Sequence, residues 1–408
     1  MLIQYEFLKI LRKRSTLIII TISLMLTGFL FGLPIIQYQI YSQDGVIKGT
    51  KGIAYEKEQY AKLSVPLSEE YIKETIQEVQ ELFKNPDSIG YDGKESFLIG
   101  DAYWNKIAPR ETLLSLIANA YSKPNEVFGY NQFPDFDITN GAFFYQSIDK
   151  KIETLLNSPS RALSQKQKEY WRSMADKIDM PFQYGYYKGW EVIISSFELL
   201  IFAILSICIV IAPVFSGEYQ AGTDAVILSG RYGKTKLITA KIAASLLFGT
   251  AVFILHITVA CGLPLAVFGI DGWDLPLQII NTVIPYPFTL LQAVFINIGI
   301  IYLVLLAMIG VTLFLSAKMK SPYFVLMILI PLLFIPMFLT PNGTTGLYNL
   351  SLFLLPYRST RPEFSKYISY QFGGFILDIL SIRVIVYLVL AGMMLPLAKL
   401  GFKRHQVA

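Results

Sequence analysis

The stretch VIISSFELLIFAILSICIVIAPV, residues 192–214, is long and apolar enough to cross a lipid bilayer as a single helix. The hydrocarbon core of a bilayer takes about 20 predominantly apolar residues at helical rise, and this stretch carries one charged side chain, Glu198. The whole chain has the same character, because 53% of its 408 residues are hydrophobic and only 16% are charged. This composition is unlike that of an ordinary soluble domain and indicates a membrane protein.

Further stretches of the chain meet the same criterion of length and apolar composition. They are residues 17–38, 237–268, 288–315, 322–340 and 379–400. Because only helices and closed barrels satisfy their backbone groups in lipid, the sequence predicts an all-α polytopic membrane protein with six transmembrane helices. The first span lies within residues 15–40, and the other five lie within residues 191–408.

A polar block, residues 41–190, separates the first span from the second. It carries 18 Lys and Arg and 21 Asp and Glu, whereas the rest of the chain carries 17 and 9. Aromatic residues recur throughout the block, which favours a folded domain over disorder. We expect this domain to be mostly helical, because apolar residues recur at helical spacing in the segments 67–84, 110–121 and 164–178.

The distribution of Lys and Arg near the span ends predicts the orientation of the chain. If the N-terminus is cytoplasmic, the inner segments carry thirteen Lys or Arg, the outer loop 269–287 carries none, and the outer loop 341–378 carries three. The sequence therefore predicts a multi-pass protein of the cell membrane. Both termini are expected in the cytoplasm and residues 41–190 outside the cell.

Residues 1–14, MLIQYEFLKILRKR, favour an amphipathic helix that lies in the membrane interface. Apolar side chains on one face can meet lipid while charged ones on the other meet water. The expected lipid-facing residues are Leu2, Phe7, Leu8 and Leu11, and the expected water-facing residues are Glu6, Lys9 and Lys13. A polar stub before the first span is the alternative.

Residues 230–235, GRYGKT, end with the letters that close a phosphate-binding P-loop. That motif, G-x-x-x-x-G-K-[ST], needs its first glycine at position 228, where this chain has Leu228. The helix that should open at Thr235 also runs into a membrane span. We therefore expect that the chain does not bind ATP itself. Because it carries neither H-E-x-x-H nor G-x-S-x-G, we do not expect it to be an enzyme.

The loop that contains GRYGKT is nevertheless unusual. FSGEYQAGTDAVILSGRYGKTKLITAK, residues 215–241, begins at the end of the second span and finishes in the third. Its helix-compatible stretch, Thr223–Leu228, is bounded by Gly222 and Gly230 and is followed by a basic cluster. A short apolar helix on a cytoplasmic loop suits docking into a groove of a partner.

This loop resembles the signature region of type-2 ABC-transporter permeases. In that family an acidic residue and a Gly-Thr pair follow the second span, and a short coupling helix then leads through a basic turn into the third. The matching residues here are Glu218, Gly222, Thr223, the AVIL stretch with Val226 and Leu228, Arg231 and Lys241. Gly230 stands where the family usually has proline. The layout of six spans with a large extracellular insertion after the first is similar to one branch of the family.

The resemblance implies the permease subunit of an ATP-driven exporter. The cytoplasmic coupling loop, residues 215–236, would contact a separate ATP-binding cassette subunit that binds ATP and Mg. The expected contact residues are Glu218, Gly222, Thr223, Val226, Leu228 and Arg231. The other expected partners are a second copy of this chain or a related permease, and membrane lipid. No nucleic acid partner is expected, and this chain itself is expected to hold no cofactor and no metal.

The resemblance and the aromatic-rich outer domain suggest export of an amphipathic peptide, an antibiotic or a lipid-like compound. The alternative is a non-transporting membrane sensor or assembly factor with a ligand-binding extracellular domain.

Two ionisable residues inside spans are candidates for a translocation path, because such groups are costly in lipid. Glu198 could line the path or neutralise a cationic substrate, or it could reach water or pair with a neighbour such as Arg383. His256 lies in mid-span, and a histidine that packs between helices is the favoured interpretation, since nothing near it has metal-ligand spacing. Lys241 and Arg383 lie near span ends, and we expect them to extend toward the headgroups.

Overall fold

The computed structural model describes residues 1–93, 95–137 and 143–404. In this part of the chain helices dominate, and the strands form four separate two-stranded antiparallel sheets. The helical class predicted from the sequence is therefore confirmed.

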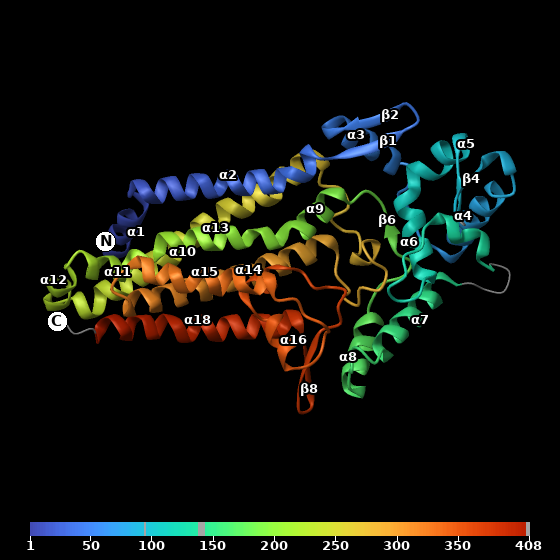
Figure 1. Ribbon diagram of the computed structural model, residues 1–408. Helices are drawn as coiled ribbons and strands as arrows, with labels where there is room; N and C mark the ends of the chain where they lie inside the picture. Colours follow the sequence, from blue (N-terminus) through green and yellow to red (C-terminus); the bar gives the residue numbers. More distant parts are fainter. Residues whose placement is uncertain (94, 138–142, 405–408) are drawn as a thin grey trace.

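Five helical segments of the described chain are long and apolar enough to cross a membrane, and they run side by side in one bundle (Figure 1). Their positions agree with five of the predicted spans. Two of them combine several elements, Lys188–Gln220 and Gly233–Phe268. The bounds are α2 (Arg14–Ile36); α9 (Lys188–Ser196), η5 (Phe197–Leu200), α10 (Ile201–Ile211) and α11 (Pro213–Gln220); η6 (Gly233–Leu237) and α13 (Ile238–Phe268); α14 (Leu290–Lys318); and α18 (Ile379–Lys403).

The sixth predicted span, residues 322–340, coincides with the shorter apolar helix α15 (Pro322–Phe338). Its 17 residues rise about 25 Å at helical pitch, less than the roughly 30 Å of a typical hydrocarbon core. A count of six transmembrane helices therefore stays a prediction.

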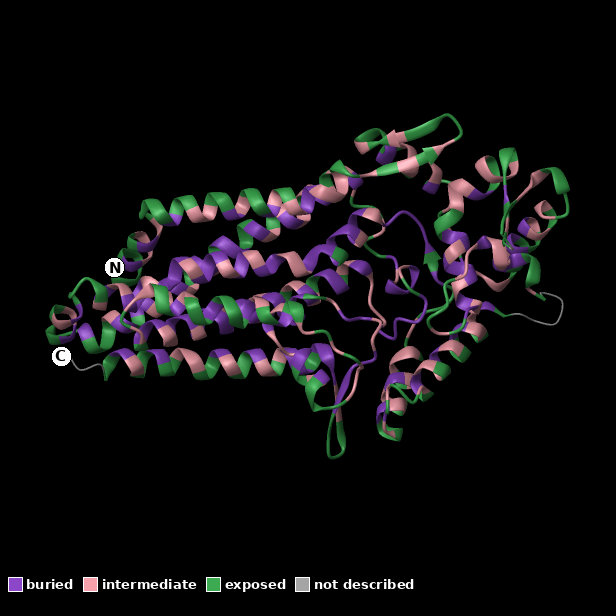
Figure 2. Ribbon diagram, viewed as in Figure 1, coloured by how far each residue is buried: buried purple, intermediate pink, exposed green. Residues whose placement is uncertain are grey.

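The outward faces of the bundle are apolar and exposed (Figure 2). In the most apolar 18-residue stretch of each helix, 33% of the residues are buried in α2 and 28% in α18. The corresponding stretch of Lys188–Gln220 is 72% buried. Exposed apolar side chains such as Ile22 and Phe29 of α2 and Leu388 of α18 account for the difference. An apolar surface of this extent needs a non-aqueous neighbour, which indicates a membrane-embedded protein.

A polar domain between α2 and α9 sits at one end of the bundle (Figure 1). Its pairs of strands are β1–β2, β3–β6 and β4–β5. The elements are β1 (Gln39–Ser42), β2 (Gly45–Lys48), α3 (Gly49–Tyr60), β3 (Val65–Pro66), α4 (Glu69–Leu82), η1 (Pro86–Ser88), β4 (Ile89–Asp92), β5 (Glu95–Leu98), α5 (Gly100–Ala102), η2 (Tyr103–Ile107), η3 (Ala108–Arg110), α6 (Glu111–Tyr121), η4 (Tyr130–Asp135), α7 (Phe144–Asn157), α8 (Gln165–Ala175) and β6 (Gln183–Tyr184).

The helices predicted in this domain at 67–84, 110–121 and 164–178 correspond to α4, α6 and α8. The first turn of α4 shows the local signal that predicts this helix. The hydroxyl of Ser68 accepts a hydrogen bond from the backbone N–H of Tyr71 at 3.2 Å, which satisfies an N–H group that the helix leaves free. Ile76 and Val79 then bury one face of the helix in the core.

The polar domain is attached to loops at its end of the bundle, which contain η7 (Leu277–Ile279), α16 (Leu347–Leu352), α17 (Pro356–Thr360), β7 (Ser369–Phe372) and β8 (Phe375–Asp378). Trp171 of α8 is fully buried there and donates a hydrogen bond to the hydroxyl of Ser369 at 3.2 Å. Its ring packs edge-on against Tyr286 and Tyr367. These contacts hold the domain against the bundle.

Arg383 of α18 does not extend toward the headgroups, so that prediction is wrong. Its side chain is completely buried and donates hydrogen bonds to the backbone carbonyls of Phe353, Arg358 and Arg361. The guanidinium adds hydrogen bonds to carbonyl groups at and after the ends of α16 and α17, where helices leave such groups without intrahelical partners.

Candidate functional site

The loop that resembles a coupling loop lies at the end of the bundle away from the polar domain, beside α1 (Leu2–Leu11) and the end of α18 (Figure 1). Its short helix, α12 (Asp224–Ser229), confirms the helix predicted at Thr223–Leu228. Val226 is 74% exposed, whereas Leu228 is buried. Arg231 is exposed and lies over the ring of Tyr232. The loop therefore presents the apolar side chain of Val226 outward, on a short helix that is held in place by the buried Leu228.

Two glycines set the shape of this loop. Gly222 has a φ of +65°, a backbone conformation that costs little only for glycine. Gly233 packs so tightly on the end of α12 that an added Cβ would lie 1.6 Å from the carbonyl oxygen of Ile227. Gly233, the glycine of the GKT sequence, therefore has a packing role.

Four charged residues, Glu6, Lys9, Glu218 and Lys241, form what we call the inner charge cluster. The ammonium of Lys241 lies 2.8 Å from Oε1 of Glu218 and 3.1 Å from Oε2 of Glu6. The ammonium of Lys9 lies 2.8 Å from the same Oε1 of Glu218. The cluster joins α1, α11 and α13, which are distant in sequence.

The inner charge cluster overturns two expectations. Glu6 was expected to face water and Lys241 to reach the headgroups, but both side chains are buried, Lys241 with only 3% of its surface exposed. A buried charge without a partner is very costly, and these two residues compensate each other. Lys9 is half-exposed. Burial tends to lower its pKa, but the hydrogen bond and charge of Glu218 outweigh this and raise the pKa above its ordinary value.

The start of α12 is attached directly to the cluster. The hydroxyl of Thr223 donates to Oε2 of Glu218 at 2.5 Å, and the backbone N–H of Thr223 donates to the carbonyl of Glu218 at 3.0 Å. Of the predicted coupling residues, the structure therefore brings Glu218 and Thr223 together. Val226 and Arg231 lie on the exposed side of the loop instead.

The helix that carries Glu218 is fixed to its neighbour by Ser316 of α14. The hydroxyl of Ser316 accepts hydrogen bonds from the backbone N–H groups of Phe215 and Ser216, each at 3.0 Å, and donates to the carbonyl of Ala212 at 2.5 Å. Pro213 removes a backbone donor at this point. Ser316 thus stabilises the backbone where α10 gives way to α11.

His256 is buried among hydroxyl groups of neighbouring helices. Its Nε2 lies 2.9 Å from Oγ of Ser23 and its Nδ1 lies 2.8 Å from Oγ1 of Thr27, both on α2. Ser23 in turn donates to the hydroxyl of Ser206 on α10 at 2.8 Å. Because both ring nitrogens have partners, the geometry favours the interpretation of His256 as a packing residue between α2 and α13.

Glu198 lies in η5, and its carboxylate is 3.7 Å from Nε of Arg361. Both side chains are partly exposed, at 30% and 48%. A neighbour was among the expected partners of Glu198, but the neighbour is Arg361 and not Arg383.

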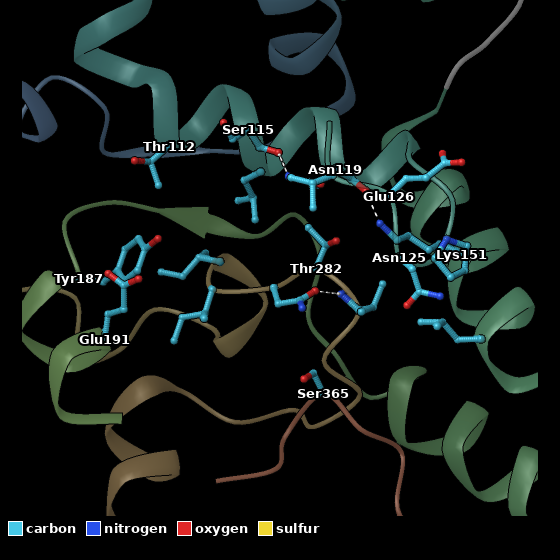
Figure 3. A pocket seen from close by; sticks show the side chains of 18 of the residues that line it. Thr112, Ser115, Asn119, Asn125, Glu126, Lys151, Tyr187, Glu191, Thr282 and Ser365 are labelled. Atoms are coloured by element: carbon cyan, nitrogen blue, oxygen red, sulfur yellow. Dashed lines mark hydrogen bonds between the residues drawn. The ribbon is translucent and has the colours of Figure 1, made fainter. Parts of the chain in front are cut away.

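A cleft of about 500 Å³ separates the polar domain from the loops of the bundle (Figure 3). Thr112, Ser115 and Asn119 of α6 line one side, and Thr282 lies opposite them. Lys151 donates to the carbonyl of Asn119 and to the hydroxyl of Ser122, and burial lowers the pKa of its ammonium group. The lining combines hydrogen-bonding side chains with apolar ones such as Leu116 and Ile279, as is usual for ligand pockets.

Sequence reasoning missed the partners that complete these sites, namely Glu6 and Lys9 in the cluster, Ser23 and Thr27 around His256, and Ser316. The sequence does contain one signal that points to the partners of Lys241. Acidic residues are scarce in the segments predicted to face the cytoplasm, where Glu6, Glu218 and Asp224 are the ones present. A lysine in a span needs a partner, so Lys241 could have been matched with Glu6 and Glu218.

Three kinds of comparison with known proteins give no match: no protein-family model, no curated protein sequence and no solved structure matches this chain. A function for the chain therefore rests on the residues and contacts described above.

Proposed function

We propose that this chain is the permease subunit of an ATP-driven ABC exporter, with ATP and Mg bound by a separate cytoplasmic subunit. The main support for this proposal comes from the coupling loop, residues 215–236. It resembles the family signature, and it presents the exposed Val226 on α12, whose start is hydrogen-bonded to the buried Glu218.

The inner charge cluster supplies a route for motion from that loop into the bundle. A partner that moves α12 would pull on Thr223 and thereby on Glu218. Glu218 is bonded to Lys241 on α13 and to Lys9 on α1. Binding of ATP to the partner can shift the bundle between inward and outward states only if the contacts differ between those states, and the cluster is the place where we expect them to differ.

The proposed topology has α15 as the sixth span, both termini in the cytoplasm and residues 41–190 outside the cell. It is supported by the position of α1 and α12 at one end of the bundle and of the polar domain at the other (Figure 1). The inner end also carries the predicted excess of Lys and Arg. The cargo class we propose is an amphipathic peptide, an antibiotic or a lipid-like compound, moved by this chain paired with a second copy or a related permease.

The decisive experiment is affinity purification of the tagged full chain from its native host in mild detergent, followed by mass spectrometry. We expect a soluble ATPase with its own P-loop at one copy per permease. The variant Val226→Asp places a charge on the exposed docking side chain and should reduce recovery of that ATPase at least tenfold. Val46→Asp, at an exposed site on β2 of the polar domain, is the matched control and should not change it.

The outcomes separate the two candidate functions. Recovery of the chain alone, or with a signalling protein, contradicts the exporter and favours the sensor. Equal ATPase recovery with Val226→Asp and Val46→Asp would leave the exporter in place but would remove α12 as its docking element.

A further inference from the structure

A second cavity, of about 490 Å³, lies where the polar domain meets the end of α2. Figure 1 shows α3 and the β1–β2 hairpin next to that end of α2. Aromatic side chains from three segments of the chain line the cavity. They are Tyr38, Tyr41, Tyr55, Tyr60, Tyr103 and Trp104.

The charges around this aromatic cavity are predominantly negative. Glu56 of α3 and Glu111 of α6 both line it. Lys188 is the only basic side chain among the described lining residues, and it is paired with Glu191 at 2.9 Å. The excess of negative charge favours a cationic ligand over an anionic one.

Glu56 is the less satisfied of the two carboxylates. Its Oε2 is buried and has no hydrogen-bond partner among the described residues, whereas Glu111 accepts a hydrogen bond from the hydroxyl of Tyr103 at 3.1 Å. Burial raises the pKa of Glu56 above its ordinary value, partly offset by a hydrogen bond with Tyr38 and by the charge of Lys188. A carboxylate in this state gains from a cation placed beside it.

We propose that this aromatic cavity binds an organic ammonium ion. The faces of Tyr and Trp rings attract such cations through their negative electrostatic potential, and sets of several rings recognise ammonium groups in preference to neutral ones. A bare metal ion is a poorer fit, because hard cations need several oxygen ligands and, among the described residues, Glu56 and Glu111 are the only carboxylates that line the cavity. The cavity volume also suits a small molecule.

This proposal does not depend on the exporter, because a sensor could use the same cavity. In an exporter its position beside the end of α2 would place it near cargo that leaves the membrane.

The test compares choline with 3,3-dimethyl-1-butanol, a neutral compound of the same shape, by saturation-transfer NMR on the full chain in detergent. We expect saturable binding of choline and at least tenfold weaker binding of the alcohol. If the two compounds bind alike, or if choline shows no saturable binding, the ammonium site is excluded.

Variants locate the binding to this cavity. Glu56→Gln and Trp104→Leu should each weaken choline binding at least tenfold. Glu58→Gln changes an exposed carboxylate on the same helix that does not line the cavity, and it should bind choline like the unmodified chain. Glu111→Gln, on a different helix, provides an independent variant if Glu56→Gln unfolds, as judged by thermal unfolding. Equal affinity of Glu58→Gln and the folded cavity variants would overturn the assignment.

Discussion

The ammonium nitrogen of Lys241 lies 2.8 Å from Oε1 of Glu218, and this contact joins α13 to α11 across the segment that contains α12. The two residues are 23 positions apart, and the loop between them contains α12 and the exposed Val226. Because Lys241 also contacts Glu6 on α1, a displacement of the loop has to strain or break contacts to two other helices. This pair is therefore the first place to test how the loop is held.

Replacement of Lys241 by methionine, Lys241→Met, should destabilise the protein by about 3–5 kcal/mol, the usual cost of removing one partner from a buried ion pair. The reason is that Glu6 loses its cation while Glu218 keeps only Lys9. The measurement is thermal or denaturant unfolding of the purified chain in detergent. Lys234→Met, at an exposed position of the same loop, is the control and should change stability by less than about 0.5 kcal/mol. Similar losses in both variants would contradict the importance of the cluster.

A glycine pair in the same loop gives a second prediction. Gly233→Ala should displace α12, because the new Cβ would lie 1.6 Å from the carbonyl oxygen of Ile227. At Gly230 the corresponding distance is 3.4 Å and φ is −66°, so Gly230→Ala should be tolerated. Limited proteolysis with trypsin reports on this difference, since Arg231 and Lys234 lie in the loop. We expect several-fold faster cleavage in Gly233→Ala alone, and equal rates in the two variants would refute the packing role of Gly233.

The third prediction separates the two interpretations of His256. His256→Phe loses the contacts to Ser23 and Thr27, and hydrogen bonds between membrane helices average about 0.6 kcal/mol each. A packing role therefore predicts a loss of about 1 kcal/mol in unfolding free energy. Thr258→Val, on an exposed part of α13, should have no comparable effect. Unchanged stability combined with abolished transport would favour a role in the translocation path.

The sequence predicted the helices of the bundle well because apolar length is a local property. Residues 192–214 and the other long apolar runs needed no knowledge of their neighbours, and α12 was readable from the glycines that bound it. The partners of charged residues were not readable. The spacing of polar residues in 1–14 is the same whether Glu6 meets water or pairs with Lys241. The pattern alone therefore could not show that Glu6 is buried. The partner of Glu198 is a residue more than 160 positions away, Arg361, and local spacing carries no information on such a pair.

The last prediction concerns the pH dependence of the polar domain. Arg172 of α8 donates two hydrogen bonds to Glu153 of α7, at 2.5 and 2.7 Å. These bonds and the positive charge of Arg172 hold the pKa of Glu153 below its ordinary value. A carboxylate with a lowered native pKa contributes stability at neutral pH, and this contribution is lost as the pH falls through the native pKa.

We therefore expect Glu153→Gln to be less stable than the unmodified chain at pH 7 and to approach it in stability as the pH falls through the native pKa of Glu153. Both side chains are partly exposed, so the difference at pH 7 should be no more than about 1 kcal/mol. Hydrogen exchange of the backbone amides of α7 and α8, followed as a function of pH, measures it locally. Glu74→Gln, at an exposed position of α4, controls for the general effect of removing a carboxylate. A difference from the unmodified chain that stays unchanged across the acidic range would show that the ionised pair is not its source.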